Sequence, residues 1–359
     1  MRLTALPCTF FLMVTLAIAP SLQASDRLIF DPPAGAEAAK HIVLVSGDEE
    51  YRTEETMPML GKLLSQKHGF KCTVLFSLAA DGLGYIDCNN QAGVVGWEEL
   101  DDADLMIIGT RFRKPSVEDS KYVTDFLNAG KPIIGIRTST HAFNGAGEFG
   151  GIPYAKFGRK ILGEEWVSHH GKHREEGARS FVEDEFADHP VLSGVGEIFC
   201  PSDVYGVVHL EDADKILMRA GVTKTLDPKS ELVEGGKNDP MQPFVWMREY
   251  KRPDGSGTGS SLCTTGGASV DFVDKDLRRL IVNASYHLTG QDVPAEADVS
   301  YVDPFYPSFY GFIREEGYFA KLNRRPEDFA LGKSPLAPDP KSAPEWNFRP
   351  RPRGEAVGK

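Results

Sequence analysis

The sequence has little cysteine, a deficit of positive charge and, beyond its first 24 residues, no long apolar run. Five cysteines in 359 residues cannot be the main source of stability, which excludes a small disulfide-framework domain. The lack of a long uncharged run after the N-terminus excludes a polytopic membrane protein. The 40 lysines and arginines are outnumbered by 52 aspartates and glutamates, for a net charge of −12. Such an acidic chain repels phosphate backbones and anionic lipid, so we expect neither a nucleic-acid partner nor stable membrane insertion.

The first 24 residues have the pattern of a secretory signal peptide. Arg2 and the free amine form a positive start, residues 10–19 are apolar, and Ala24 is a small residue before the expected cleavage site. The alternative is an anchoring N-terminal helix, for which the apolar stretch is short. We therefore expect a periplasmic or extracellular protein. The later cysteines lie mostly in apolar runs and are expected to be buried thiols, with one disulfide as the alternative: Cys72, Cys88, Cys200 and Cys263.

Short apolar runs alternate with helical patterns along residues 40–290, which we expect to form one domain. Strands are predicted at 41–46, 71–76, 104–109 and 132–136, with helices at 54–69, after 110 and at 274–290. The predicted apolar face of the middle helix includes Val117, Tyr122, Val123 and Phe126. Near-continuous apolar strands separated by helices predict a flavodoxin-like α/β fold. Its parallel sheet would have helices on both faces and the first strand in the centre. Later strands are predicted at 215–221, 243–251 and 259–267.

The composition changes at residue 291. Ten of the 24 prolines lie in 291–359, together with the aromatic run YVDPFYPSFYGF at 301–312. Proline excludes long helices and central strands, and the aromatics indicate that this extension packs back onto the domain. From about residue 333 we expect it to be loosely ordered.

Polar residues gather where the predicted strands end. Because ligands of open α/β sheets bind beyond the carboxyl ends of the strands, these residues predict one polar pocket for a hydroxyl-rich or anionic small molecule. Two arginines beside several histidines would make the pocket locally cationic. The candidate substrate-binding residues are Asp48, Glu49, Tyr51, Arg52, Arg111, Arg137, Thr138, His173, Asp203, Tyr205 and Thr265. The candidate catalytic residues are His141, His169 and His170.

Several of these residues admit two interpretations. Arg137 would clamp a carboxylate or sugar hydroxyls, or form an internal ion pair with Asp48 or Glu49. His141 would serve in acid–base catalysis or in packing. The acids and bases after the first strand would contact substrate or form a solvated, self-paired loop.

The histidines of residues 169–173 also admit two interpretations. Together with Asp203 or Glu165 they could bind a divalent metal, but no fourth ligand is fixed by the spacing. The alternative is a polar loop that lines the pocket. We therefore expect no cofactor and no metal, with a divalent metal as the lesser alternative.

Several motifs in order along residues 40–290 resemble the ThuA-like (trehalose utilisation) family, and most closely its secreted planctomycete-type branch. They are HIVLVSGDEEYRTEE, PIIGIRTSTHAF, the HHG after a tryptophan, DHPVLSGV followed by SDVY, and PFVWMREY followed by CTTGGA and LRRLIVNA. The resemblance implies the class I glutamine amidotransferase-like, flavodoxin-like fold. It also implies carbohydrate metabolism, with a sugar or an oxidised (keto) sugar as ligand.

The sequence departs from the related motifs at three places. Arg137 stands where an amidotransferase has its nucleophilic cysteine, which excludes that chemistry because a guanidinium cannot accept an acyl group. An acid is replaced by Ser202 in the SDVY block, and a histidine of the late pair by Gly267. Two functions remain open: a sugar-active isomerase, lyase or hydrolase, and a non-catalytic carbohydrate-binding protein with a degenerate site. The sequence leaves the oligomeric state undetermined.

Overall fold

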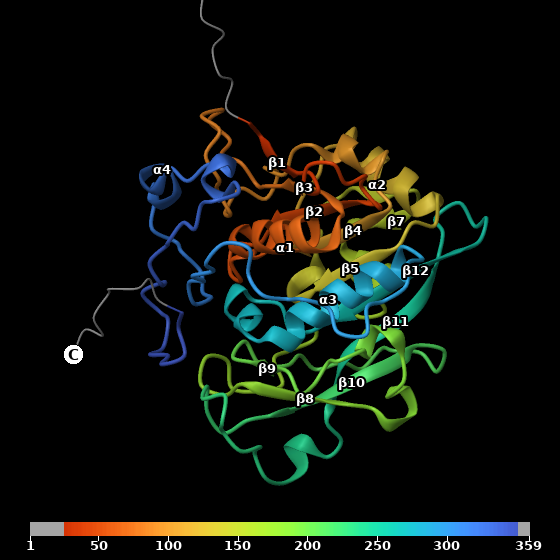
Figure 1. Cartoon of the computed structure of the whole chain (residues 1–359), viewed down its shortest axis with the longest axis vertical. Coiled ribbons are helices and arrows are strands. Elements are labelled where there is room, and N and C mark those ends of the chain that lie inside the picture. Colours follow the sequence, from red (N-terminus) through yellow and green to blue (C-terminus); the bar gives the residue numbers. More distant parts are fainter. Residues whose placement is uncertain (1–24, 351–359) are drawn as a thin grey trace, which may run out of the picture.

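The computed structural model describes residues 25–350, so the expected signal peptide at 1–24 lies outside the described residues. Ten strands form one mixed sheet in the order β1-β3-β2-β4-β5-β12-β11-β10-β8-β9 (Figure 1). The first half of the chain supplies β1 (Arg27–Phe30), β2 (His41–Gly47), β3 (Lys71–Leu75), β4 (Leu105–Thr110) and β5 (Ile133–Ile136). The second half supplies β8 (Ala178–Val182), β9 (Phe199–Cys200), β10 (Lys215–Val222), β11 (Gln242–Lys251) and β12 (Thr258–Thr264).

The four strands predicted first are parallel neighbours, and β2 lies between β3 and β4 as expected. β12 continues this parallel part beside β5. The expectation of a wholly parallel sheet is wrong, because β1, β11, β10, β8 and β9 all pair antiparallel with their neighbours. A short hairpin of β6 (Glu148–Phe149) and β7 (Ile152–Pro153) stands apart from the sheet.

Helices lie on both faces of the parallel part. α1 (Thr53–His68) and α3 (Lys275–Leu288) bury Leu60 and Leu280 in one apolar cluster, and both lie in front of the sheet in Figure 1. α2 (Asp119–Asn128) packs Phe126 into a second cluster. Val117 is not on its apolar face, since it precedes the helix and is 79% exposed. Among the described residues, no helix has the length and apolar character needed to cross a membrane.

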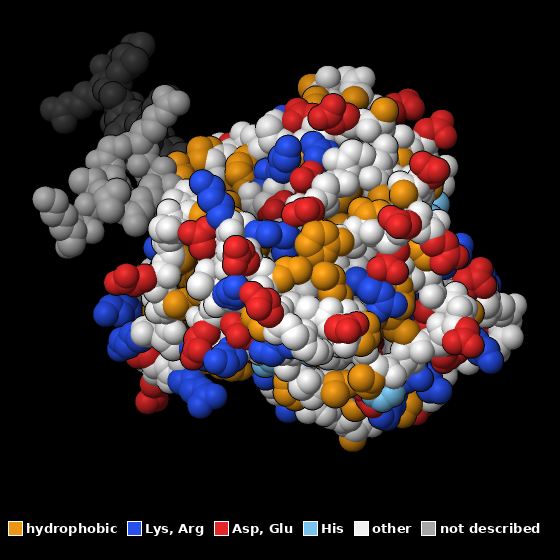
Figure 2. Space-filling view, turned by 90° about the horizontal axis from the view of Figure 1, so that it is seen from below, with side chains coloured by type: hydrophobic (Ala, Val, Ile, Leu, Met, Phe, Trp, Pro, Cys, Tyr) orange, Lys and Arg blue, Asp and Glu red, His pale blue; other side chains and the backbone are white. Residues whose placement is uncertain are grey.

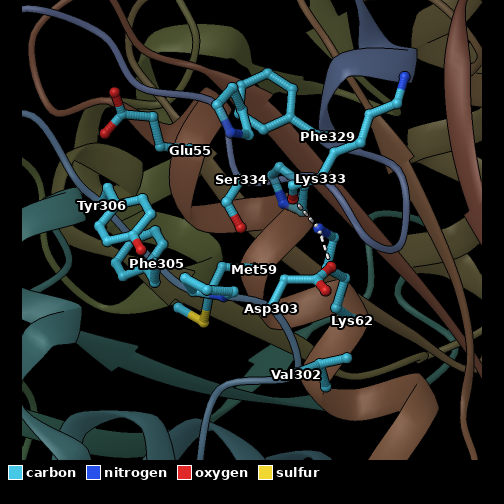
Figure 3. Close-up of a pocket in the computed structure, with 13 residues that line it drawn as sticks. Glu55, Met59, Lys62, Val302, Asp303, Phe305, Tyr306, Phe329, Lys333 and Ser334 are labelled. Atoms are coloured by element: carbon cyan, nitrogen blue, oxygen red, sulfur yellow. Dashed lines mark hydrogen bonds and ion pairs between the residues drawn. The ribbon is translucent and has the colours of Figure 1, made fainter. Parts of the chain in front are cut away.

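The extension from residue 291 runs along one side of the molecule and includes α4 (Tyr318–Leu322) (Figure 1). Its Phe305 and Phe329 are buried in the cluster of α1 and α3. Figure 3 shows Lys62 of α1 between Asp303 and Lys333 of the extension; its Nζ lies 2.6 Å from the Asp303 carboxylate. The cavity that these residues line measures about 30 Å³, which holds a water molecule or two but no sugar.

Residues 333–350, for which the sequence suggests loose order, make defined contacts in the structure. Trp346 is 9% exposed and packs against Phe309 with ring centroids 5.7 Å apart. Arg349 pairs with Asp339 at 2.9 Å. The described part of the extension therefore belongs to the packed molecule.

Candidate functional site

Asp48 organises the loop that joins β2 to α1. It is fully buried, and its Oδ1 accepts hydrogen bonds from the backbone N–H groups of Glu50 and Tyr51 at 2.7 and 2.9 Å. The Thr138 hydroxyl donates to Oδ2 of the same carboxylate. Burial raises the pKa of Asp48 against the effect of these hydrogen bonds. Asp48 and Thr138 thus hold two strand-end loops together, and neither side chain is exposed to solvent.

Arg137 follows β5 and begins the short helix η2 (Arg137–His141) with φ 45°. Its side chain is 0% exposed and is stacked between the rings of Tyr51 and Tyr205, 4.6 and 4.0 Å from their centroids. Nη1 donates to the carbonyl oxygens of Asp203 and Thr265 at 3.0 and 2.8 Å. Nη2 lies 3.1 Å from Oδ1 of Asp203. Arg137 is therefore an internal ion-pair residue, but its partner is Asp203 and not Asp48 or Glu49.

Asp203 is the point at which the predicted site residues meet. It is 0% exposed and has φ 67°. Its Oδ2 is hydrogen-bonded to Nδ1 of His169 at 3.0 Å and to Nδ1 of His173 at 3.3 Å. Burial alone would raise the pKa of Asp203. The Arg137 charge and the two histidine hydrogen bonds outweigh burial and lower it. Asp203 is thus a carboxylate at neutral pH that fixes both imidazole rings.

His173 lies between two carboxylates. Nδ1 faces Asp203, and Nε2 lies 3.3 Å from Oε1 of Glu50. Burial opposes protonation, but the hydrogen bond to Asp203 and the nearby Glu50 carboxylate prevail and raise the pKa of His173. This arrangement favours the imidazolium form. His169 is different, because its side chain is 26% exposed and its hydrogen bonds leave Nε2 free of protein partners among the described residues.

His141 joins the site through ring contacts. Its ring lies 5.0 Å from Phe112, 5.9 Å from Trp166 and 6.3 Å from Tyr205. Burial, together with the charges of Arg111 and Arg137, lowers the pKa of His141 to about 3. The imidazole is therefore neutral at pH 7 and cannot donate a proton as a general acid there. Trp166 is 44% exposed, and the centroid of its ring lies 6.1 Å from that of His169.

The expected cationic pocket is not present, because carboxylates neutralise the arginines. Glu49 binds both Arg111 and Arg113. Arg111 is also 3.8 Å from Glu50. Burial and the Asp48 charge raise the pKa of Glu49, although the two arginines oppose this shift. The guanidinium of Arg111 stays 20% exposed and lies over the ring of Phe112 at 4.6 Å.

Two residues of the extension complete the site and were not among the sequence candidates. Tyr310 stacks on Tyr51 at 5.2 Å and approaches His173 at 5.1 Å. Phe312 lies 4.9 Å from the Arg111 guanidinium. The aromatic run at 301–312 was the available signal, but sequence alone gives no reason to bring residue 310 beside residue 51. Glu50, Phe112 and Trp166 were also missed, although each adjoins a candidate in the sequence.

Three candidates are not brought to Asp203 and the imidazoles around it. Nε2 of His170 faces the Lys237 carbonyl oxygen at 2.6 Å. Arg52 is buried and donates to the Gly311 carbonyl oxygen at 2.8 Å, which ties the extension to α1. Thr265 is buried, and only its backbone oxygen takes part, as an acceptor for Arg137.

Within residues 25–350, one group of side chains could hold a metal ion. It consists of His169, His173 and Asp203, whose ligand atoms lie within 4.8 Å of one another. Glu165 does not join them and pairs instead with Lys156 at 2.8 Å. The Arg137 guanidinium, 3.1 Å from Asp203, already neutralises this carboxylate and so weakens the group as a ligand set for a second cation.

No family model matches the sequence, and no curated protein matches it either. Among solved structures, a ThuA-like protein from Bacteroides uniformis is 15% identical with a TM-score of 0.45, covering 72% of this chain and 94% of its own. A ThuA-like protein from Parabacteroides merdae is 12% identical with a TM-score of 0.45 over 71% and 92%. The glutaminase domain of Trypanosoma brucei CTPS is 11% identical with a TM-score of 0.32 over 72% and 98%. Likeness of this degree assigns neither a family nor an activity to the chain.

Proposed function

We propose that this protein binds and transforms a carbohydrate or keto sugar at the His169–Asp203 pair, without glutamine amidotransferase activity. The observation that carries the proposal is the buried Asp203 carboxylate, which orients the partly exposed imidazole of His169 and the more buried ring of His173. The exposed ring of Trp166 beside His169 offers an apolar surface on which the face of a sugar ring can pack. The resemblance of the sequence motifs to ThuA-like proteins supports the same ligand class.

The chemistry that fits these groups is proton transfer beside a sugar carbonyl. With the Nδ1–H of His169 donated to Asp203, the lone pair on Nε2 is available as a general base. His173, whose two ring nitrogens face Asp203 and Glu50, fixes the position of the Asp203 carboxylate beside His169. Arg137 acts only through Asp203 and is a positioning residue. Such a step can begin the reaction of a sugar isomerase, of a lyase, or of a hydrolase that first removes this proton.

No described cysteine is placed to act as the nucleophile for glutamine hydrolysis. Arg137 occupies the turn after β5, and the cysteines of residues 25–350 are all buried free thiols. Burial raises the pKa of Cys200 and Cys263, which keeps both protonated at neutral pH. We therefore expect no ammonia release from glutamine.

Binding is tested by calorimetry with glucose, trehalose and their keto derivatives, on wild type, His169→Ala and Trp166→Ala. Turnover is tested by following the ring protons of each bound sugar by NMR in heavy water. We expect saturable binding of at least one sugar, weakened about tenfold by Trp166→Ala. We also expect proton exchange in the wild type, lowered about a hundredfold or more in His169→Ala. Dialysis against a chelator should leave both readouts unchanged.

His287→Gln is the matched control, since His287 is a partly buried histidine whose ring contact is with His189, outside the site. It should bind and turn over as wild type does. Binding without any exchange or product would favour the alternative, a non-catalytic carbohydrate-binding protein. Failure of every sugar to bind a folded wild type would contradict the proposal.

A further inference from the structure

A second cavity, of about 560 Å³, opens beside the C-terminal end of β11 and the N-terminal end of β12. It is lined by the β6–β7 turn, by the short helix η4 (Gly158–Leu162) and by the residues that end β11. This volume is within the range of small-molecule sites. None of its lining residues belongs to the candidate functional site.

The cavity lies at the opposite end of the two strands from that site. Lys251 of β11 pairs with Thr258 at the start of β12, whereas Thr264 at the end of β12 pairs with Ile136, next to Arg137. Within β11 the lining residues run from Lys251 back to Arg248, which pairs with Ser261, three residues of strand or roughly 10 Å from Thr264. A ligand of this cavity would therefore contact neither His169 nor Asp203.

The lining carries an excess of positive charge in an otherwise acidic protein. Five cations line the cavity, against the carboxylates of Glu211 and Glu249: Arg159, Lys160, Arg248, Lys251 and Arg252. The face in Figure 2 shows the ordinary pattern of this surface, with basic and acidic side chains interspersed. Lys160, Lys251 and Arg252 have no carboxylate within ion-pair distance among residues 25–350. The local field therefore favours an anion.

Arg248 is the buried element of this cluster. Its side chain is 9% exposed, and Nε lies 3.3 Å from Asp214, while Nη2 lies 3.6 Å from Glu211. Nε and Nη1 nevertheless have no hydrogen-bond partner. A buried guanidinium with unused donors is costly unless an acceptor reaches it. An oxyanion supplies such acceptors, because its oxygens match the planar donors of arginine.

We propose that this cavity is a binding site for a small oxyanion, a phosphate or sulfate group, carried free or as an ester on a small molecule. Arg248 provides the donors, which are buried in the empty cavity and become accessible when Glu211 moves aside. Lys160 and Lys251 provide mobile charges that attract and enclose the anion. Glu211, which is 62% exposed, swings away from Arg248 when the anion enters.

The proposal is tested by calorimetry at constant ionic strength, with inorganic phosphate, sulfate, glucose 6-phosphate, glucose 6-sulfate and uncharged glucose as the probes. We expect saturable binding of one anion per chain by at least one charged probe. Glucose should not compete for the cavity. Affinity for the free ions alone would identify an ion site, and tighter binding of an ester would identify a phosphorylated or sulfated small molecule.

Arg248→Gln and the double variant Lys160→Gln, Lys251→Gln should each weaken anion binding about tenfold. Lys229→Gln is the matched control, because Lys229 is exposed and lines no part of the cavity. His169→Ala should bind the anion as wild type does, which separates this proposal from the proposed function. The double variant changes only exposed lysines, so it remains informative if Arg248→Gln fails to fold. Undiminished binding by the double variant, or no saturable binding by wild type, would overturn the assignment.

Discussion

The burial of Arg137 determines its role, because a side chain with no exposed surface stabilises the site and does not contact a ligand directly. Its guanidinium is stacked between two tyrosine rings and paired with Asp203, with no exposed surface. Arg137→Ala would leave the buried Asp203 carboxylate without its strongest partner, so we expect a loss of about 3–5 kcal/mol in the free energy of unfolding. Urea denaturation followed by circular dichroism measures it. An unchanged midpoint would show that Asp203 finds another partner and that Arg137 is dispensable for folding.

His141 leads to a prediction of pH dependence. Its pKa falls from 6.5 to about 3 on folding because burial and two arginines disfavour the imidazolium. The unfolded chain therefore binds one more proton at this residue between those values, so His141 makes the fold less stable as the pH falls from 6.5 towards 3. His141→Gln should remove this component while keeping a polar side chain of similar length. Unfolding free energies measured from pH 8 to pH 4 should decline less steeply in the variant, and parallel curves would contradict the assigned shift.

The same residues show what sequence can predict of a site. Because the carboxyl ends of parallel strands share one edge of the sheet, the sequence predicted that the polar residues after these strands lie together. This holds for His141, His169, His173 and Asp203. Solvent exposure was not predictable, because the burial of Arg137 depends on the rings of Tyr51 and Tyr205, which come from two distant segments of the chain. The pairing of Glu49 with Arg111 was likewise hidden, so arginines that count as free cations in the sequence are paired with carboxylates in the structure.

At the scale of elements, Glu55 joins α1 to the C-terminal extension. Its carboxylate accepts hydrogen bonds from the Ser308 backbone and hydroxyl groups, at 2.9 and 2.7 Å, and from the Ser269 hydroxyl at 2.8 Å. Burial and the neighbouring Glu54 charge raise the pKa of Glu55 to about 7. The folded chain therefore binds an extra proton between pH 4.5 and 7.

That shift gives a prediction opposite in sign to the one for His141. The stability contributed by protonated Glu55 is present below pH 4.5 and is lost as the pH rises through 7. Glu55→Gln, which keeps a neutral group of the same shape, should gain stability relative to wild type over this range. The gain should be on the order of 3 kcal/mol by pH 8. Thermal unfolding of both proteins from pH 4.5 to 8 measures the difference, and a constant offset across that range would contradict it.

The sequence predicted the individual elements better than their directions. Apolar runs located β2, β3, β4 and β5, and alternation with helices required them to be parallel. No α-helix intervenes between β10, β11 and β12, so the argument for parallel pairing did not apply to them, and they form antiparallel pairs. The four residues of β1 were missed because a run that short has no distinct periodicity.

On the scale of the whole molecule, the extension supplies part of both the core and the site. Phe305 and Phe329 are buried with α1 and α3, while Tyr310 and Phe312 contact His173 and Arg111. The proposed sugar binding and the stability of the fold therefore depend on the same segment, whose described residues add no strand to the sheet. This coupling could not be read from the sequence, which indicated that the extension packs on the domain but not which surface it covers.

A chain that ends at Gly290 tests this coupling. Removing the extension exposes the apolar residues of α1 and α3 that it covers and leaves the buried Lys62 without Asp303. At about 25 cal/mol per Å² of newly exposed apolar surface, we expect a destabilisation comparable to the whole stability of a domain. The truncated chain should therefore aggregate or bind the dye ANS, as measured by fluorescence and size-exclusion chromatography.

The double variant Tyr310→Ala, Phe312→Ala separates the two roles, because it keeps Phe305 and Phe329 in the core. It should weaken sugar binding more than it lowers the melting temperature. If the truncated chain unfolds cooperatively at the wild-type temperature, residues 40–290 fold alone and the extension is an accessory to the site only.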